Sequence, residues 1–155
     1  MLIRAFEPAD ADALAALFHA SVRQIGIRDY STEQVIAWSP SQPKPEEYLR
    51  RAEGQWLLVA ENSDCEPIGY AAMGPDGRID HLYCRPDAVG TGVGLALYAA
   101  LENAAKDSGI SVLTVEASEA ARRLFERAGF KVEARNNFEV NGVAIHNYRM
   151  SKPIG

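Results

Sequence analysis

Three alternate glycines between Gly90 and Gly94 form the stretch of this sequence best suited to hold a ligand. The segment before them, Arg78 to Arg85, has the composition of a strand, and Pro86 ends it because proline cannot donate to a sheet ladder. From about Val93 to Lys106 apolar residues recur at helical spacing, so the loop leads into a helix. The free amide N–H groups and the positive dipole end of such a helix predict an anion site, above all for phosphate.

Two common phosphate-binding loops do not fit this spacing. The third glycine of the dinucleotide fingerprint would fall at Leu95, and no lysine stands where a Walker A loop needs one. The glycine loop therefore indicates a phosphate site of another kind.

Residues 82–87 and 89–94 resemble the acetyl-CoA loop of the GCN5-related N-acetyltransferase (GNAT) superfamily, whose signature is Arg/Gln-x-x-Gly-x-Gly/Ala. Gly92 and Gly94 match that signature, whereas Val89 stands where the Arg or Gln is expected. The resemblance implies acetyl-CoA as cosubstrate, with its pyrophosphate held by residues 89–94.

Further segments extend this resemblance over nearly the whole chain. Residues 118–130 are similar to the helix and Gly-Phe turn that close the cofactor site, and residues 3–10 are similar to the opening strand of the superfamily. Residues 79–83 and the ending at 147–153 are most similar to its bacterial YafP-like branch. Resemblance to that branch does not indicate a particular acceptor substrate.

Length and composition are those of one globular domain spanning residues 1–155. Hydrophobic residues make up 47% and charged residues 24% of the chain, and no apolar run is long enough for a membrane span. The N-terminus has no signal-peptide pattern, and the two cysteines have no metal-type spacing, so we expect a cytoplasmic protein without a metal site. The formal charge of −5 argues against nucleic acid as a partner.

The order of expected elements agrees with the resembled fold. The patterns predict a single-domain, GNAT-like α/β (α+β) fold: a mixed, mostly antiparallel twisted sheet of about seven strands with helices on both faces. Expected strands are 2–6, 56–61, 67–74, 78–85, 111–116, 130–135 and 143–150, and expected helices are 10–24, 31–38, 45–52, 92–107 and 118–129. Ser31 with Gln34 forms a capping box, and Asn141-Gly142 is a hairpin turn signal.

The resemblance implies how the cofactor is held. Main-chain groups of Leu82, Tyr83 and Cys84 meet the pantetheine arm, and the Leu82 amide is the expected donor to the developing oxyanion. The full set of expected cofactor residues is Leu82, Tyr83, Cys84, Val89, Gly90, Thr91, Gly92, Val93, Gly94, Ser118, Ala121, Arg122 and Phe125. Arg85, Arg122 and Arg123 are candidates for the positive group missing at Val89, or are solvated surface charges.

Three residues are the candidates for proton transfer: Asp80, His81 and Tyr148. Asp80 is the preferred base, because a carboxylate within a strand and on the same face as Leu82 is costly unless it is paired or functional. The alternative is an ion pair with Arg78 or Arg85. His81 points to the opposite face and is the second choice.

The general acid is left open. Many members of the superfamily use a tyrosine where this chain has Phe125. Either CoA leaves as the thiolate, or one of Tyr148, Tyr83, Tyr30 and Cys84 donates the proton. Cys84 as an acetylated nucleophile is the less favoured alternative to a small packed side chain.

The acceptor is expected to be a small-molecule amine or a protein amine, bound against the aromatic residues Tyr30 and Trp38 unless these only pack. The quaternary state is open, with a homodimer as one expected form. The alternative function is a non-catalytic acetyl-CoA-binding sensor or partner module.

Overall fold

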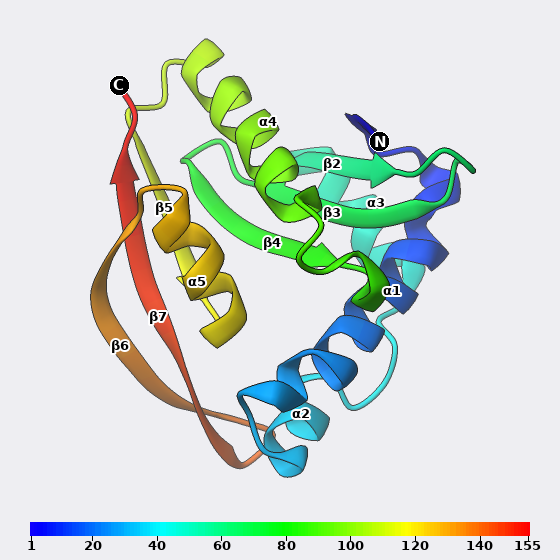
Figure 1. Ribbon diagram of the computed structural model, residues 1–155, viewed down its shortest axis with the longest axis vertical. Helices are drawn as coiled ribbons and strands as arrows, with labels where there is room; N and C mark the ends of the chain where they lie inside the picture. Colours follow the sequence, from blue (N-terminus) through cyan, green and yellow to red (C-terminus); the bar gives the residue numbers. More distant parts are fainter.

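A computed structural model describes all 155 residues as one seven-stranded sheet with helices on both faces (Figure 1). The strand order is β1-β2-β3-β4-β5-β7-β6. The strands are β1 (Leu2–Ala5), β2 (Trp56–Glu61), β3 (Pro67–Met73), β4 (Arg78–Cys84), β5 (Val112–Ala117), β6 (Lys131–Val140) and β7 (Val143–Pro153). The helices are α1 (Ala11–Gln24), α2 (Thr32–Trp38), α3 (Pro45–Gly54), α4 (Val93–Asp107) and α5 (Glu119–Arg127). The expected fold class is confirmed.

Local signals start and stop these elements as the sequence predicts. Ser31 accepts from the Gln34 amide while the Gln34 side chain accepts from the Ser31 amide, so α2 begins with a capping box. At the β6–β7 turn, Asn141 and Gly142 have φ values of 49° and 80°, as a two-residue hairpin turn requires. The last hairpin is longer than expected, because residues 136–140 continue β6 by pairing with residues 143–147 of β7.

Two main cores lie on opposite faces of the sheet. One packs α4 and α5 against the sheet around Leu97, Leu101 and Phe125, and the other packs α1 and α3 against its other face around Leu14 and Tyr48. Figure 1 shows α4 and α5 in front of the sheet and α3, drawn fainter, behind it. The strand β4 contributes side chains to both cores, so changes in β4 act on either face.

The sheet is weakest between β4 and β5, its only parallel neighbours. Only Arg78 and Ile79 of β4 pair with β5, opposite Thr114 and Val115. Beyond Ile79 the two strands run apart, with β4 heading toward α1 in Figure 1. The main chain of β4 from Asp80 to Cys84 is therefore unpaired on its β5 side.

Candidate active site

A cleft of about 560 Å³ occupies the place where β4 and β5 separate. Its walls come from the end of α1, from Trp38, from β4 and the glycine loop, and from β5 and α5. Of the residues expected from the sequence, it brings together Trp38, Asp80, His81, Leu82, Tyr83, Cys84, Val89, Gly90, Gly92, Gly94, Ser118, Ala121, Arg123 and Phe125. Residues distant in the sequence thus meet at one site.

The main chain of β4 presents hydrogen-bonding groups to this cleft. Arg85 donates to the Ile68 carbonyl at 2.8 Å, and the residues of β4 alternate in facing β3. The main-chain N–H and C=O groups of His81 and Tyr83 therefore bond to β3, whereas those of Leu82 and Cys84 point toward the cleft. An extended ligand can pair with these groups as an extra strand would.

The glycine loop presents a second set of donors. The amide N–H groups of Gly90, Gly92 and the first three residues of α4 have no hydrogen-bond partner within the protein, since the first helical bond runs from Ala96 to Gly92. Gly90 and Gly92 have φ values of 79° and 94°, in the left-handed region that glycine adopts without strain. Five free N–H groups at a helix N-terminus fit a diphosphate.

Helix α5 closes the cleft on the opposite side. The Ser118 hydroxyl accepts from the Ala121 amide at 3.3 Å and caps the helix. Leu124 packs against Gly94 so closely that a Cβ on Gly94 would lie 2.5 Å from its Cδ1 atom. Glycine at position 94 therefore allows α4 and α5 to approach each other. Phe125 is 1% exposed and packs edge-on against Tyr98 and Phe130.

Asp80 is exposed and ion-paired with Arg78, which is the alternative to the role of base that the sequence left open. A β-bulge shifts the register between Ala72 and Met73, leaving Asp80 without a partner on β3. Its exposed carboxylate hydrogen-bonds to Arg78, Arg51 and Gln55, whereas Leu82 packs against the α4 side. The bulge thus breaks the alternation that would have placed Asp80 and Leu82 on one face. Asp80 still lines the cleft, but its oxygens are occupied by these donors.

His81 and Tyr83 are the side chains of β4 with polar atoms left free in the cleft. The Nδ1 atom of His81 lies 2.7 Å from the Tyr70 hydroxyl, and its Nε2 atom has no partner and stays accessible to solvent. Burial, with a contribution from Arg51, lowers the pKa of His81 to about 3, so the ring is neutral at pH 7. The Tyr83 hydroxyl likewise has no partner and is accessible, while burial raises its pKa.

Tyr148 and Tyr30 lie outside the cleft wall. The Tyr148 hydroxyl donates to Glu119 at 2.7 Å, a bond that raises the pKa of Tyr148, and Arg122 stacks over its ring at 4.6 Å. Tyr30 is 6% exposed, and its hydroxyl donates to the His146 carbonyl and accepts from the Glu119 amide. Burial raises the pKa of Tyr30 to about 12. The Tyr30 hydroxyl thus joins the α1–α2 segment to β7 and α5, whereas the Tyr148 hydroxyl joins β7 to α5.

The arginines expected to replace the missing positive group are already paired. Arg85 contacts Asp87, Arg123 contacts Asp29, and Arg122 contacts Glu119 and Glu126. Arg122 does not line the cleft, nor do Thr91 and Val93, whose main chain belongs to the loop and helix start.

The sequence reasoning missed Arg127, which lines the cleft one turn beyond Leu124 and has no carboxylate partner. The helical spacing of Leu124 and Arg127 is the signal that would have found it. The other cleft residues that sequence reasoning did not select for the site are Ser21, Val22, Ile25, Gly26, Arg28, Leu95, Val115, Glu116, Ala117, Ala120 and Leu124.

Cys84 lines the cleft but is poorly suited to be a nucleophile. Burial raises the pKa of its thiol to about 11, so the thiolate is scarce at pH 7. Its side chain packs at the edge of the α4 core. Packing is the role that the geometry favours for Cys84.

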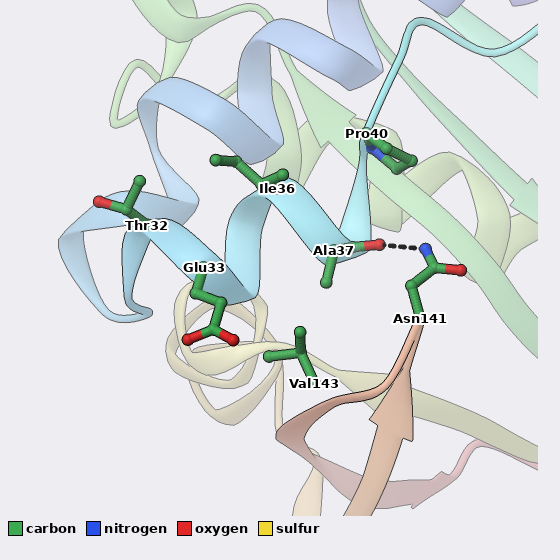
Figure 2. A pocket seen from close by; sticks show the side chains of 7 residues that line it. All are labelled: Thr32, Glu33, Ile36, Ala37, Pro40, Asn141 and Val143. Carbon is green, nitrogen blue, oxygen red and sulfur yellow. Dashed lines mark hydrogen bonds between the residues drawn. The ribbon is translucent and has the colours of Figure 1, made fainter.

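A second hollow lies on the surface between α2 and the β6–β7 turn (Figure 2). Its volume is about 760 Å³, and its walls include Ile36, Pro40 and Val143. The side-chain amide of Asn141 points at the Ala37 carbonyl and donates to it at 2.8 Å. Since Glu33 is the only charged residue in the walls, the arrangement offers no pair of groups for acyl transfer.

Comparison with known proteins identifies the class to which this cleft belongs. Residues 27–152 match the family model described as the acetyltransferase (GNAT) domain, and the chain belongs to this family of acetyltransferases. No helix is long and apolar enough to cross a membrane.

The relatives agree with this assignment. A GCN5-related N-acetyltransferase from Rhodopseudomonas palustris is 38% identical, with a TM-score of 0.89 over 98% of this chain and 94% of that one. N-acetyltransferase YafP of Escherichia coli (strain K12) is 28% identical over 96% of this chain and 93% of its own length. This match agrees with the predicted resemblance to the YafP-like branch. The fold is shared by yncA of Salmonella typhimurium, solved with its cofactor acetyl-CoA (22% identity, TM-score 0.78, covering 100% and 94% of the two chains). These findings confirm the expected cosubstrate for this family.

Proposed function

We propose that this protein transfers the acetyl group of acetyl-CoA to a primary amine by direct attack in the cleft between β4 and β5. The observation that carries the proposal is the pairing of two donor sets at one opening. The main-chain groups of Leu82 and Cys84 face the cleft unpaired, and the five free amides of the glycine loop lie at its edge. The first set suits the pantetheine arm and the second the diphosphate.

Two groups of the protein then act on the transfer. The Leu82 amide donates to the oxygen of the acetyl group as negative charge develops on it. The new C–N bond forms as the C–S bond breaks, and the amine proton passes to water in the open cleft. The sulfur takes a proton from the Tyr83 hydroxyl, which solvent then restores. Asp80 forms ion pairs with Arg51 and Arg78 and is not the base in this scheme.

Arg127 supplies the positive charge that the family signature places at position 89. It is the cleft arginine on α5 without a carboxylate partner, and it lies one helical turn from the residue that touches Gly94. We assign it to a phosphate of the cosubstrate. Trp38 and the end of α1 form the side of the cleft left for the amine. The identity of the amine, small molecule or protein, and the pairing of two copies stay predictions.

Release of free CoA thiol from acetyl-CoA, followed with a panel of amines and N-terminal peptides, tests the proposal. Amine-dependent release with one acetylated product per CoA supports it. Tight binding of acetyl-CoA in calorimetry with no release on any amine would favour the sensor module instead. Absence of binding would remove the assignment of the cleft altogether.

A further inference from the structure

Three side chains form a buried hydrogen-bonded chain that ends in the cleft. The hydroxyl oxygens of Tyr48 on α3 and Tyr70 on β3 lie 3.0 Å apart, and the Tyr70 oxygen lies 2.7 Å from His81 Nδ1. Tyr48 is 2% exposed and Tyr70 is fully buried. The rings of Phe18 and Tyr83 pack around His81 at 5.6 and 5.4 Å between ring centres, which fixes the orientation of the imidazole.

The hydrogen atoms of this chain can be assigned by elimination. The Tyr48 hydroxyl has no hydrogen-bond partner other than Tyr70, so it donates to the Tyr70 oxygen. Tyr70 must then direct its own hydrogen to Nδ1 of His81, the one acceptor left to it. The reverse direction would leave the buried Tyr48 hydrogen without an acceptor, at a cost of about 1–3 kcal/mol.

This direction determines the tautomer of His81. A neutral imidazole carries one hydrogen, and Nδ1 is occupied as an acceptor, so the hydrogen sits on Nε2. Nε2 is the ring atom without a partner, and the residue lines the cleft next to Leu82. His81 therefore presents an N–H donor to the cleft and has no free lone pair with which to remove a proton from an amine.

We propose that the buried Tyr70 hydroxyl fixes His81 as the Nε2–H tautomer, so that His81 acts in acetyl transfer as a neutral hydrogen-bond donor to the acetyl oxygen beside the Leu82 amide, and not as a base. This inference rests on the proposed function. His81 is a catalytic residue in it, whereas Tyr70 is a positioning residue that acts through His81. Tyr48 donates to Tyr70 and serves here to reveal the direction of the Tyr70 hydrogen. A neutral donor suits the task, because it stabilises developing charge without a competing proton transfer.

The tautomer can be measured without any substrate. The chain has three histidines, His19, His81 and His146, and a long-range ¹H–¹⁵N spectrum of histidine-labelled protein at pH 7 distinguishes the two neutral tautomers. The His81→Asn spectrum assigns the His81 resonances by their loss. We expect the Nε2–H pattern for His81, and an Nδ1–H pattern would overturn the inference even if the protein proves to be an active acetyltransferase.

Two variants of His81 separate a donor from a base. Glutamine can place an N–H near the position of Nε2, whereas asparagine reaches only as far as Nδ1. We expect His81→Asn to lower kcat about 100-fold, and His81→Gln to retain at least ten times the activity of His81→Asn, with KM for acetyl-CoA unchanged in both. Equal losses in the two variants would contradict the donor role.

Two variants of the tyrosine pair test the positioning argument. In Tyr48→Phe, the Tyr70 hydroxyl still has Nδ1 as its only acceptor, so the tautomer and kcat should stay near wild type. In Tyr70→Phe, Nδ1 loses its donor, and we expect His81 to populate the Nδ1–H form and kcat to fall about tenfold. An unchanged His81 tautomer in folded Tyr70→Phe would refute the claim that Tyr70 sets it. If wild-type protein releases no CoA with any amine, the proposed function fails, while the spectrum still decides the tautomer.

Discussion

Replacing Gly92 with alanine isolates the contribution of the glycine loop to cofactor binding. Gly92 has a φ of 94°, and a side chain in this region costs about 1–2 kcal/mol. An added Cβ would meet no heavy atom within 4 Å, so the variant introduces backbone strain and no clash. The loop can relieve this strain only by rotating its peptide groups, which turns the free N–H groups of Gly92 and Val93 away from their present direction.

The size of the expected effect follows from the bonds at risk. A hydrogen bond to a charged group contributes about 1.5–3 kcal/mol, so loss of one amide contact to a phosphate weakens acetyl-CoA binding roughly 10- to 100-fold. Calorimetric titration with acetyl-CoA measures the affinity, and thermal unfolding of the same samples measures the strain.

Gly109 provides a matched control for this experiment. It has a φ of 78°, it also has no heavy atom within 4 Å of an added Cβ, and it lies just past the other end of α4. Gly109→Ala should lower stability as much as Gly92→Ala while leaving acetyl-CoA affinity unchanged. If the two variants lose the same stability and both bind acetyl-CoA like wild type, the loop amides do not hold the diphosphate and the reasoning fails.

Four further predictions address single side chains. Tyr83→Phe should lower kcat about 100-fold, as loss of a general acid does, with KM for acetyl-CoA unchanged in steady-state kinetics; wild-type turnover would mean that CoA leaves as the thiolate. Arg127→Ala should weaken acetyl-CoA binding up to about tenfold, less at high salt, whereas Arg50→Ala on the exposed face of α3 should not; equal affinities would assign Arg127 to the solvated surface. Asp80→Asn should leave kcat within about threefold of wild type over the pH profile, because the Asp80 carboxylate oxygens are occupied by Arg51, Arg78 and Gln55. A loss of activity confined to low or high pH would restore Asp80 as the base. Asp10→Asn should destabilise the fold by about 2 kcal/mol at pH 7, because Arg4 donates to both oxygens of Asp10 at 2.8 Å and lowers the pKa of that carboxyl. The stabilisation is present above the unfolded-state pKa near 4 and is lost as the pH falls from there through the lowered folded-state pKa. Urea unfolding of both proteins at pH 7 and pH 3 should therefore show a smaller difference in stability at pH 3.

The alternation of strand residues was a less reliable guide than the turn and loop signals. The glycine loop, the Ser31 cap and the Asn141-Gly142 turn each depend on residues a few positions apart, and all three lie where the sequence predicts. The side of β4 on which Asp80 lies depends instead on a bulge against β3, and nothing within β4 marks that bulge. A single extra residue in a strand reverses the face of every side chain that follows it.

The sequence by itself determined the order of elements, the phosphate loop and the family, because these depend on local backbone preferences and on motifs. Only the tertiary structure decided which polar groups are free to act. Arg123 is paired with Asp29, which precedes α2, and His81 receives its hydrogen bond from Tyr70, whose own partner lies on α3. Hydrogen bonds and ion pairs of this kind join residues distant in the chain, so their partners are fixed by packing and are not encoded at any one position.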